Sequence, residues 1–404
     1  MDYSQNKKTV NIYGGGSAAL ILAFELAKSE KFDIRIYERN KALARKFLVA
    51  GKGGFNLTHN LEFKELSKYY RPAGFLDTYL QEFDSVKFRN WLARIGISTF
   101  VGSSNRVFPV KGIKPIEVLQ AIMKGLEGPN VHIYYNARFI GFKDGVPTVE
   151  QGEKAVVCNA DFHVYAFGGS SWTKTGSDGH WLKIFREEGI KVNGFGAANC
   201  GLEVKWNKDF IKKHEGKHVK NIAIEYNSFG KKGEFTITKY GIEGNAVYPI
   251  SSAVSEALKL KKEVSIGIDL KPQLSYEAIL SKLDTSIANK RLVTSALKSL
   301  KISAVAIDML KLNCTKTEWT TSRLLATKIK SFSLSISGHR PLDECISTTG
   351  GISTTALDNN LMLVQKPNHF CIGEMVDWDA PTGGFLLQAC FAMGYSLSKR
   401  LQKL

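Results

Sequence analysis

The apolar positions near the N-terminus follow two different periods in succession. Thr9–Tyr13 is a short run of residues that favour β-structure, whereas Ser17–Lys28 repeats apolar residues at helical spacing. The three glycines Gly14–Gly16 separate the two runs without any further spacer. A second apolar run, Asp33–Tyr37, follows the helical one. The pattern therefore predicts a strand, a tight turn, a helix and a second strand.

This order of elements is typical of a βαβ unit that binds a dinucleotide. In that arrangement Gly14 permits the turn, Gly16 lets the backbone come close to a pyrophosphate, and the small Ala19 allows close helix–strand packing. The first helical residues, Ser17 and Ala18, direct backbone N–H groups and a positive partial charge toward the phosphates. We therefore expect the adenosine diphosphate half of a cofactor at this turn.

The second strand ends in Glu38, which lies 24 residues after Gly14. An acid at this distance is placed to accept hydrogen bonds from the ribose hydroxyls, and it disfavours a 2′-phosphate, so FAD or NAD is favoured over NADP. The loop that follows combines basic side chains with a glycine-rich turn, which suits a loop wrapped over an anionic cofactor or, equally, an ordinary exposed loop. Its candidate cofactor contacts are Arg39, Arg45, Lys46, Gly51, Gly53, Gly54 and Asn56.

Two later segments predict a return to the same site. Phe162–Gly169 is typical of a buried strand that ends in glycines, and a second strand is predicted at His369–Gly373. A glycine-rich loop then opens a long apolar helix, whose positive N-terminus is placed to stabilise negative charge on a reduced flavin ring. The candidate contacts in these segments are Gly168, Gly373, Glu374, Pro381, Thr382, Gly383 and Gly384.

The middle of the chain has a different pattern. Short alternating strands, separated by glycine turns, run from about residue 200 to 270, and amphipathic helices follow at Tyr276–Leu283, Val293–Leu312 and Trp319–Ile329. A further helix is expected at Leu80–Ile95. We predict an α/β protein with a discontinuous, Rossmann-like FAD-binding domain of the two-dinucleotide-fold type and an inserted β-rich and helical unit. The predicted parts are 1–196 and 332–404 for the FAD-binding domain, 197–272 for the β-rich insertion and 273–331 for the helical insertion.

Composition narrows the class of protein. The 404 residues are 44% hydrophobic, yet they contain no apolar leader and no run of about 18 apolar residues, which predicts a cytoplasmic protein without a membrane span. The six cysteines are scattered, which favours reduced, packed thiols over disulfides or a zinc site. His214 and His218 are four residues apart, but no third metal ligand is near, and we predict no metal site.

Positive charge is concentrated in the middle of the chain. Residues 196–335 hold 23 Lys and Arg against 13 Asp and Glu, a net charge of +10 out of +17 overall. This balance is compatible with a polyanionic partner or with a solvated, lysine-rich surface. Trp206 and Phe210 lie among the lysines and are candidates for stacking on unpaired bases. The candidate RNA contacts are Lys205, Lys208, Lys212, Lys213, Lys217 and Lys220.

The glycine turn, the Glu38-Arg39-Asn40 run and the segment ARKFLVAGKGGFNLTH at 44–59 together resemble the BaiN/YhiN-type family of NAD(P)/FAD-dependent flavoproteins. The family usually has GGGRCNxTN in this loop, where this chain has Gly54 and Phe55 in place of the Arg and Cys. No role of that Cys can therefore be carried over. The resemblance covers nearly the whole chain, and it places the RVFP motif, Arg106–Pro109, near the flavin and the substrate.

The resemblance implies reduction of a carbon–carbon double bond that is conjugated to a carbonyl group. Uridine in ribosomal RNA, reduced to dihydrouridine, is the first candidate substrate, a steroid enone is the second, and a non-enzymatic RNA-binding protein that contains FAD is a third possibility. No second glycine fingerprint is present, so NAD(P)H is expected to visit the flavin only transiently. The candidate proton donors are His59, Tyr240 and Cys200, each of which is also compatible with an ordinary packed or solvated side chain.

Overall fold

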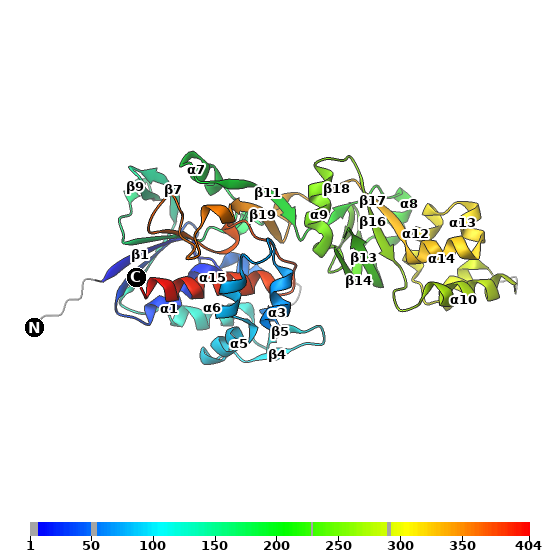
Figure 1. The fold of residues 1–404 in the computed structure, drawn as a ribbon, viewed down its shortest axis with the longest axis horizontal. Coiled ribbons are helices and arrows are strands. Elements are labelled where there is room, and N and C mark those ends of the chain that lie inside the picture. Colours follow the sequence, from blue (N-terminus) through cyan, green and yellow to red (C-terminus); the bar gives the residue numbers. More distant parts are fainter. Residues whose placement is uncertain (1–6, 50–54, 228, 289–291) are drawn as a thin grey trace, which may run out of the picture. The chain divides into compact units, whose positions relative to one another are not determined.

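The computed structural model describes residues 7–49, 55–227, 229–288 and 292–404 (Figure 1). The candidate contacts Gly51, Gly53 and Gly54 lie outside these described residues. The chain forms two compact units, which we describe separately. Unit 1 comprises Met1–Phe195 and Ser347–Leu404, and unit 2 comprises Gly196–Ile346.

A five-stranded parallel sheet forms the centre of unit 1. Its strands, in spatial order, are β20 (His369–Cys371), β10 (Phe162–Tyr165), β1 (Lys8–Tyr13), β2 (Phe32–Glu38) and β6 (Val131–Tyr135). The predicted first strand is thus central, with the predicted second strand on one side and the returning strand on the other. All four residues of β10, including His163, are buried, which is typical of a strand that is covered on both faces.

Helix α1 (Ser17–Ala27) follows β1 and packs against the last helix, α15 (Phe385–Leu401), so that an early and a late segment of the sequence lie side by side (Figure 1). A small residue makes this contact close. A Cβ atom on Gly394 of α15 would lie only 2.3 Å from the carbonyl oxygen of Ala18 in α1. The core of unit 1 therefore depends on a pair of helices that are more than 350 residues apart in the sequence.

The other elements of unit 1 surround this core. The helix predicted at Leu80–Ile95 is in fact two helices, because Asp84 accepts a hydrogen bond from the Lys87 N–H at 2.8 Å and caps the second one. The remaining elements are α2 (Arg45–Val49), β3 (Thr58–His59), α3 (Phe63–Leu66), α4 (Asp77–Glu82), α5 (Ser85–Arg94), β4 (Thr99–Val101), β5 (Arg106–Pro109), α6 (Pro115–Lys124), β7 (Ala137–Lys143), β8 (Val146–Gln151), β9 (Lys154–Val157), α7 (Trp181–Glu187) and β19 (Ser347–Ile352), which pairs with β11 (Val192–Ala198).

Unit 2 combines a seven-stranded sheet with helices. The sheet has the order β17 (Phe332–Ile336), β16 (Val264–Asp269), β13 (His218–Tyr226), β14 (Phe229–Thr238), β15 (Gly241–Glu243), β12 (Leu202–Glu203) and β18 (Gly338–His339). The helices are α8 (Lys208–His214), α9 (Tyr248–Leu258), α10 (Tyr276–Ala288), α11 (Val293–Ser299), α12 (Ala304–Asn313), α13 (Lys316–Thr320) and α14 (Ser322–Lys330). One hydrophobic core contains buried residues from both the strands and the helices.

The domain boundaries differ from those that we predicted. We placed the return to the FAD-binding domain at residue 332, but β17 pairs with β16 from Val264↔Ile336 to Ile268↔Phe332 and belongs to unit 2. Two predicted helices are also interrupted. Lys301 has a φ of +56°, which ends the helical run between α11 and α12, and an extended Thr321 separates α13 from α14. The β-rich and helical insertions share the single core described above.

No helix among the described residues is long and apolar enough to cross a membrane. Five of the six cysteines are buried, and Cys314 is partly buried. Within the same described part of the chain, no group of three or more His, Cys, Asp or Glu side chains could hold a metal ion. His214 and His218 have separate partners, since His214 bonds to Asp308 and His218 bonds to Thr236.

Candidate functional site

The glycine turn of unit 1 contains three glycines with different surroundings. Gly14 has a φ of +98°, and a Cβ atom on it would lie 2.6 Å from the Ala166 carbonyl oxygen. A Cβ atom on Gly15 would lie 2.2 Å from a methyl carbon of Leu43. A Cβ atom on Gly16 would have just one atom within 4 Å, the Ala166 carbonyl oxygen at 3.8 Å. The backbone itself requires glycine at Gly14, a side chain at Gly15 would have to displace Leu43, and Gly16 faces a space that the protein leaves open.

Helix α1 begins in this open space. Its N-cap is Gly16, so no side chain caps the helix, and Ser17 and Ala18 form its first turn. The first N–H groups of a helix lack intrahelical partners and carry a positive partial charge. The start of α1 is therefore suited to an anion such as a pyrophosphate.

Glu38 holds the turn from the end of β2. Its carboxylate is buried, accepts a 2.8 Å hydrogen bond from the Gly15 N–H and accepts two more from Asn40, at 2.8 Å from the backbone N–H and 2.6 Å from the side-chain amide. The Asn40 side-chain oxygen in turn accepts from Arg45 at 2.8 Å. A carboxylate can accept about four hydrogen bonds, so Glu38 retains capacity for a ribose hydroxyl while it fixes the turn.

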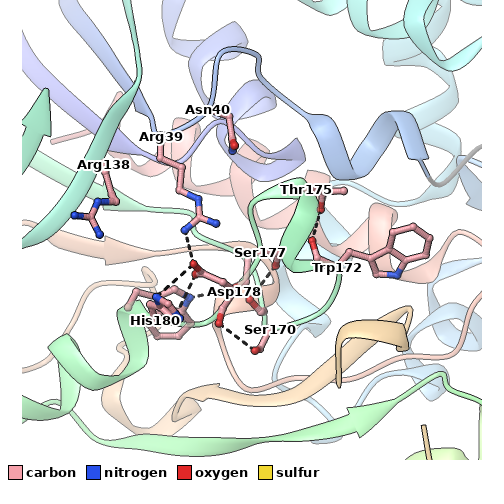
Figure 2. Close-up of polar contacts among 12 residues, drawn as sticks. Arg39, Asn40, Arg138, Ser170, Trp172, Thr175, Ser177, Asp178 and His180 are labelled. Carbon is pink, nitrogen blue, oxygen red and sulfur yellow. Dashed lines mark hydrogen bonds and ion pairs between the residues drawn. The ribbon is translucent and has the colours of Figure 1, made fainter. Parts of the chain in front are cut away.

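Arg39 connects this loop to the segment after β10. Its guanidinium group lies 2.6 Å from the Asp178 carboxylate, whereas Arg138 of β7 pairs with Glu150 and lies apart from this pair (Figure 2). Burial alone would raise the pKa of Asp178, but hydrogen bonds from Arg39 and from the His180 N–H hold the pKa below its usual value. The loop after β10 is thus tied to the loop after β2.

Neither Ser177 nor Asp178 caps the helix that follows. The N-cap of α7 is His180, and no side chain caps the helix. Asp178 pairs with Arg39 instead, and the Ser177 hydroxyl donates to the Gly169 carbonyl oxygen at 2.8 Å (Figure 2). Both side chains stabilise the loop that contains Gly168, whose φ is +73°.

Lys46 brings the N-terminal and C-terminal motifs together. Its ammonium group lies 2.8 Å from the Glu374 carboxylate and donates to the Ser171 hydroxyl at 2.8 Å. Next to Glu374, a Cβ atom on Gly373 would lie 3.1 Å from the Cβ atom of Ala18 in α1. The loop after β2, the loop after β10 and the end of β20 therefore meet at the start of α1.

Trp172, beside Ser171, has a φ of +61°, and its carbonyl oxygen accepts a hydrogen bond from Thr175 at 2.7 Å (Figure 2). Positive φ is unusual for a bulky residue and costs on the order of 1–3 kcal/mol. Such strain occurs most often at functional sites. In this protein the strained residue, Trp172, lies in the loop whose Ser171 hydroxyl accepts the hydrogen bond from Lys46.

The loop that contains Pro381, Thr382, Gly383 and Gly384 packs against β3 and β5. Gly384 has a φ of +95°, and a Cβ atom on it would lie 2.6 Å from the Cα atom of Thr58. A Cβ atom on Gly383 would lie 3.4 Å from the Arg106 guanidinium. Gln388 in α15 accepts a 2.6 Å hydrogen bond from the Thr58 hydroxyl. The start of α15, whose N-cap is Gly384 without a side-chain cap, is thus held beside the RVFP strand.

His59 lies at the same junction, because its ring stacks on Phe385 at 4.9 Å and its backbone pairs with Arg106. The other two candidate proton donors belong to unit 2. Cys200 is 1% exposed and packs in a small buried cluster, so a substrate has no path to its thiol. Tyr240 donates a hydrogen bond to Glu243, and burial together with this bond raises the pKa of its hydroxyl. The geometry favours His59 among the three.

The residues of unit 1 fit a dinucleotide cofactor. Asn56 has a buried side-chain amide nitrogen without a hydrogen-bond partner among the described residues, and a buried donor of this kind is costly to leave unpaired. Gly16 leaves a space that a side chain would fill, and neither α1 nor α15 has a side-chain cap. An extended anionic ligand with hydrogen-bond acceptors would satisfy these groups.

The six candidate RNA-binding lysines of unit 2 are all exposed, but they differ in their partners. Lys205 and Lys213 each lie 2.6 Å from a carboxylate, of Glu263 and Asp308 respectively, and Lys220 lies 3.9 Å from that of Glu234. For Lys208, Lys212 and Lys217, no carboxylate partner exists among the described residues.

The two aromatic residues among these lysines are less available than we predicted. Phe210 is only 4% exposed, packs between Trp206 and His214, and belongs to the core of unit 2, so its proposed stacking on bases is wrong. Trp206 is partly buried, and its ring N–H donates to the Gly241 carbonyl oxygen at 3.0 Å.

Sequence reasoning missed several residues that the fold brings to the site. The Asn40 side chain donates a hydrogen bond to Glu38 and accepts one from Arg45. The Ser171 hydroxyl accepts a hydrogen bond from Lys46, and the Gln388 side chain accepts one from Thr58. A signal was available for Gln388, since it is an isolated polar residue in an apolar helix and is fully buried. A buried polar group of this kind requires a hydrogen-bond partner.

Comparison with known proteins gives consistent matches along the whole chain. A family described as "HI0933-like protein Rossmann domain" matches residues 8–400. The chain is 24% identical to the 3-dehydro-bile acid delta(4,6)-reductase of Clostridium scindens, over 96% of this chain and 97% of that protein. It is 22% identical to the ribosomal RNA dihydrouridine synthase of Haemophilus influenzae, over 99% of both chains.

One solved structure has a similar fold along the whole chain. It is the 3-ketosteroid delta1-dehydrogenase of Sterolibacterium denitrificans, in complex with 1,4-androstadiene-3,17-dione. The two chains are 11% identical with a TM-score of 0.51, and the match covers 99% of this chain and 100% of that one.

Proposed function

Because the chain belongs to the family of HI0933-like proteins with a Rossmann domain, we propose that it is an FAD-dependent oxidoreductase that reduces a carbonyl-conjugated C=C bond. The observation that carries this proposal is the meeting of the N-terminal and C-terminal motifs in one site. Lys46 pairs with Glu374, and Gly373 packs on Ala18, at the open start of α1. A site built by both ends of the chain suits a long cofactor that extends from α1 to α15.

Each half of FAD has candidate residues in this site. The start of α1 and Gly16 would hold the pyrophosphate, and Glu38 would accept from the ribose. Gly383 and Gly384, at the start of α15, would hold the flavin end. Bound FAD supplies the two-electron reduction of the double bond, with NAD(P)H as the proposed electron donor.

The chain's own groups have two tasks in this chemistry. A conjugated carbonyl oxygen gains negative charge when the double bond is reduced, and the Arg106 guanidinium is proposed to stabilise that charge. Arg106 has no carboxylate partner among the described residues. His59, on the strand paired with that of Arg106, is the proposed proton donor.

Uridine in ribosomal RNA is the proposed substrate. The exposed lysines of unit 2 and the net charge of +10 in residues 196–335 support an RNA partner, because phosphate contacts dominate the affinity for nucleic acids. The target base would be turned out of its stack onto the cofactor face, at a cost of about a few kcal/mol.

A small carbonyl-conjugated enone is the second candidate. It is favoured by the 24% identity to the bile-acid reductase of Clostridium scindens over 96% of the chain. The two substrates require the same chemistry, since the double bond of each is conjugated to a carbonyl group. Only the means of holding the substrate distinguishes them.

Nucleoside analysis of ribosomal RNA from a strain that lacks this protein tests the proposal. We expect one dihydrouridine to disappear and to return on complementation with the wild-type gene. A variant with Lys205, Lys208, Lys212 and Lys217 changed to Glu should not restore it, because the reversed charges repel phosphates. The same variant should retain its FAD and its NAD(P)H-driven reduction of an artificial acceptor.

Two results would argue against the RNA substrate. One is unchanged dihydrouridine in the deletion strain, combined with reduction of a steroid enone by the purified protein. The other is full complementation by the four-lysine variant. If the purified protein contains no FAD, the entire proposal is rejected.

A further inference from the structure

Unit 2 contains a cavity of about 200 Å³ between strand β13 and the start of helix α12, two elements that pack together (Figure 1). The polar residues that line it are His218, Lys220, Asn221, Lys271, Lys301 and Ser303. No carboxylate is among its lining residues. The cavity is separate from the candidate cofactor site, all of whose described residues belong to unit 1.

An irregularity in β13 forms one wall of this cavity. The register of the β13–β14 pair shifts between Val219 and Ile222, and Asn221 has a φ of +57°. A regular strand would turn either Lys220 or Asn221 toward the core, because successive side chains alternate between faces. The bulge leaves both exposed while Val219 and Ile222 are buried. Two adjacent polar side chains therefore reach the cavity.

The opposite wall comes from the turn before α12. Lys301 has a φ of +56° and is exposed, whereas the next residue, Ile302, is buried. Ser303 is the N-cap of the ten-residue helix α12, and its hydroxyl accepts from the Ala306 N–H. The positive end of the helix dipole thus points toward the side on which Lys301 lies.

Within the described part of the chain, one of the three cavity lysines has a carboxylate partner and the other two have none. Lys271 and Lys301 have no carboxylate within ion-pair distance among the described residues, and Lys220 has only Glu234, at 3.9 Å. The acid nearest to Lys271 in sequence, Asp269, is held by Lys330 at 2.5 Å. Three like charges around one cavity repel each other, and an anion in the cavity would relieve that repulsion.

Of the six lysines that the sequence pattern singled out, Lys220 alone is among the lining residues of this cavity. Two of the others, Lys205 and Lys213, are each paired with a carboxylate at 2.6 Å. The cavity instead combines unpaired ammonium groups with neutral hydrogen-bond donors, such as the Asn221 amide, in a concave wall. This combination is suited to an anion in both shape and charge.

We infer that this cavity is a binding site for a phosphate group. Its volume of about 200 Å³ is below the roughly 300–1,000 Å³ of sites for whole drug-sized ligands, so it suits one charged group rather than an entire cofactor. The source of the phosphate is an RNA strand, which rests on the proposed function. The phosphate site itself does not depend on that function.

The test compares two pairs of lysines in the full-length protein. Lys271→Ala with Lys301→Ala removes two charges from the cavity. Lys261→Ala with Lys262→Ala removes two charges from exposed positions of unit 2 that do not line it. A third variant, Lys271→Arg with Lys301→Arg, keeps the charge in place. Melting temperature and circular dichroism establish that all three variants fold.

Calorimetric titration with inorganic phosphate measures the site directly. We expect the wild type, the Lys261/Lys262 control and the arginine pair to bind phosphate, and the alanine cavity pair to bind it at least about tenfold more weakly. For a single-stranded RNA of about 12 nucleotides, the log–log salt dependence between about 50 and 200 mM should become shallower by about 0.7 in the cavity pair, the value for one lost phosphate contact.

Each outcome has a distinct meaning. Equal phosphate affinity in the cavity pair and the control pair, or no phosphate binding by the wild type, would overturn the inference. Phosphate binding that RNA does not compete for supports the site and assigns it to a small phosphorylated molecule. Specific loss of phosphate binding in the cavity pair supports the site even if no uridine is reduced, in which case the proposed function alone fails.

Discussion

Substitution of single glycines by alanine separates the fold of the glycine turn from its binding of a cofactor. In Gly14→Ala, the new methyl group would lie 2.6 Å from the Ala166 carbonyl oxygen at a φ of +98°. The left-handed conformation costs about 1–2 kcal/mol, and overpacking against a backbone atom costs about 1–3 kcal/mol. The apoprotein should therefore lose about 2–5 kcal/mol of unfolding free energy.

Gly16→Ala should weaken FAD binding but should have little effect on the stability of the apoprotein. Its φ is −81°, and the nearest atom to the new methyl group is 3.8 Å away. Alanine is a poorer N-cap than glycine, so the apoprotein should lose at most about 1 kcal/mol. If a pyrophosphate lies over Gly16, the methyl group occupies its space, and FAD should bind at least about tenfold more weakly, a difference of about 1.4 kcal/mol.

Gly96→Ala is the matched control, because Gly96 has a φ of +85° and no atom within 4 Å of the added methyl group. Gly96→Ala isolates the cost of the left-handed conformation. The apoprotein should therefore lose about 1–2 kcal/mol of unfolding free energy, and its FAD affinity should be unchanged.

The assay is scanning calorimetry of the flavin-free proteins together with calorimetric titration of FAD. The interpretation is refuted if Gly16→Ala binds FAD like the wild type, or if it destabilises the apoprotein as much as Gly14→Ala does.

Three further predictions follow from unit 1. A double-mutant cycle of Lys46→Ala and Glu374→Ala should give a coupling energy of about 0.5–3 kcal/mol in urea unfolding, and additive effects would remove the link between the two motifs. Changing Arg39 to Ala should lower the FAD affinity and raise the pKa of Asp178, measured by NMR, since its main hydrogen-bond donor is lost; an unchanged pKa would contradict the pair. Burial lowers the pKa of His163 from about 6.5 to about 4. As the pH decreases, His163 is protonated in the unfolded chain before it is protonated in the folded protein. The unfolding free energy should therefore fall as the pH decreases from about 6.5 to about 4. His163→Gln should remove about 2 kcal/mol of the loss between pH 7 and pH 5, and an identical pH dependence in both proteins would contradict the shift.

Local patterns in the sequence were sufficient to predict the framework of the site. The run Thr9–Tyr13, the glycines Gly14–Gly16 and the helix from Ser17 are in the structure β1, the turn and α1, and the predicted strand at His369 is β20. These elements depend on periodicity and on glycine at positive φ, which are properties of a few neighbouring residues. Their order also predicted that the two ends of the chain form one domain.

Other features depended on residues that are distant in sequence. β17 belongs to unit 2 because it pairs with β16. Phe210 is buried in the core of unit 2, although Lys208 and Lys212 lie two positions before and after it in the sequence. The break between α11 and α12 follows from the positive φ of Lys301, a residue whose type does not indicate a turn.

The side-chain contacts of the site were decided only by tertiary structure. The Lys46–Glu374 ion pair and the packing of Gly384 on Thr58 each join residues that are more than 320 positions apart. The cavity of unit 2 likewise combines residues of β13 with the turn before α12. Periodicity and turn chemistry act over a few residues, whereas an ion pair or a cavity exists only once packing has brought distant segments within a few ångströms. The sequence therefore determined which elements form, and the packing of those elements determined which side chains meet.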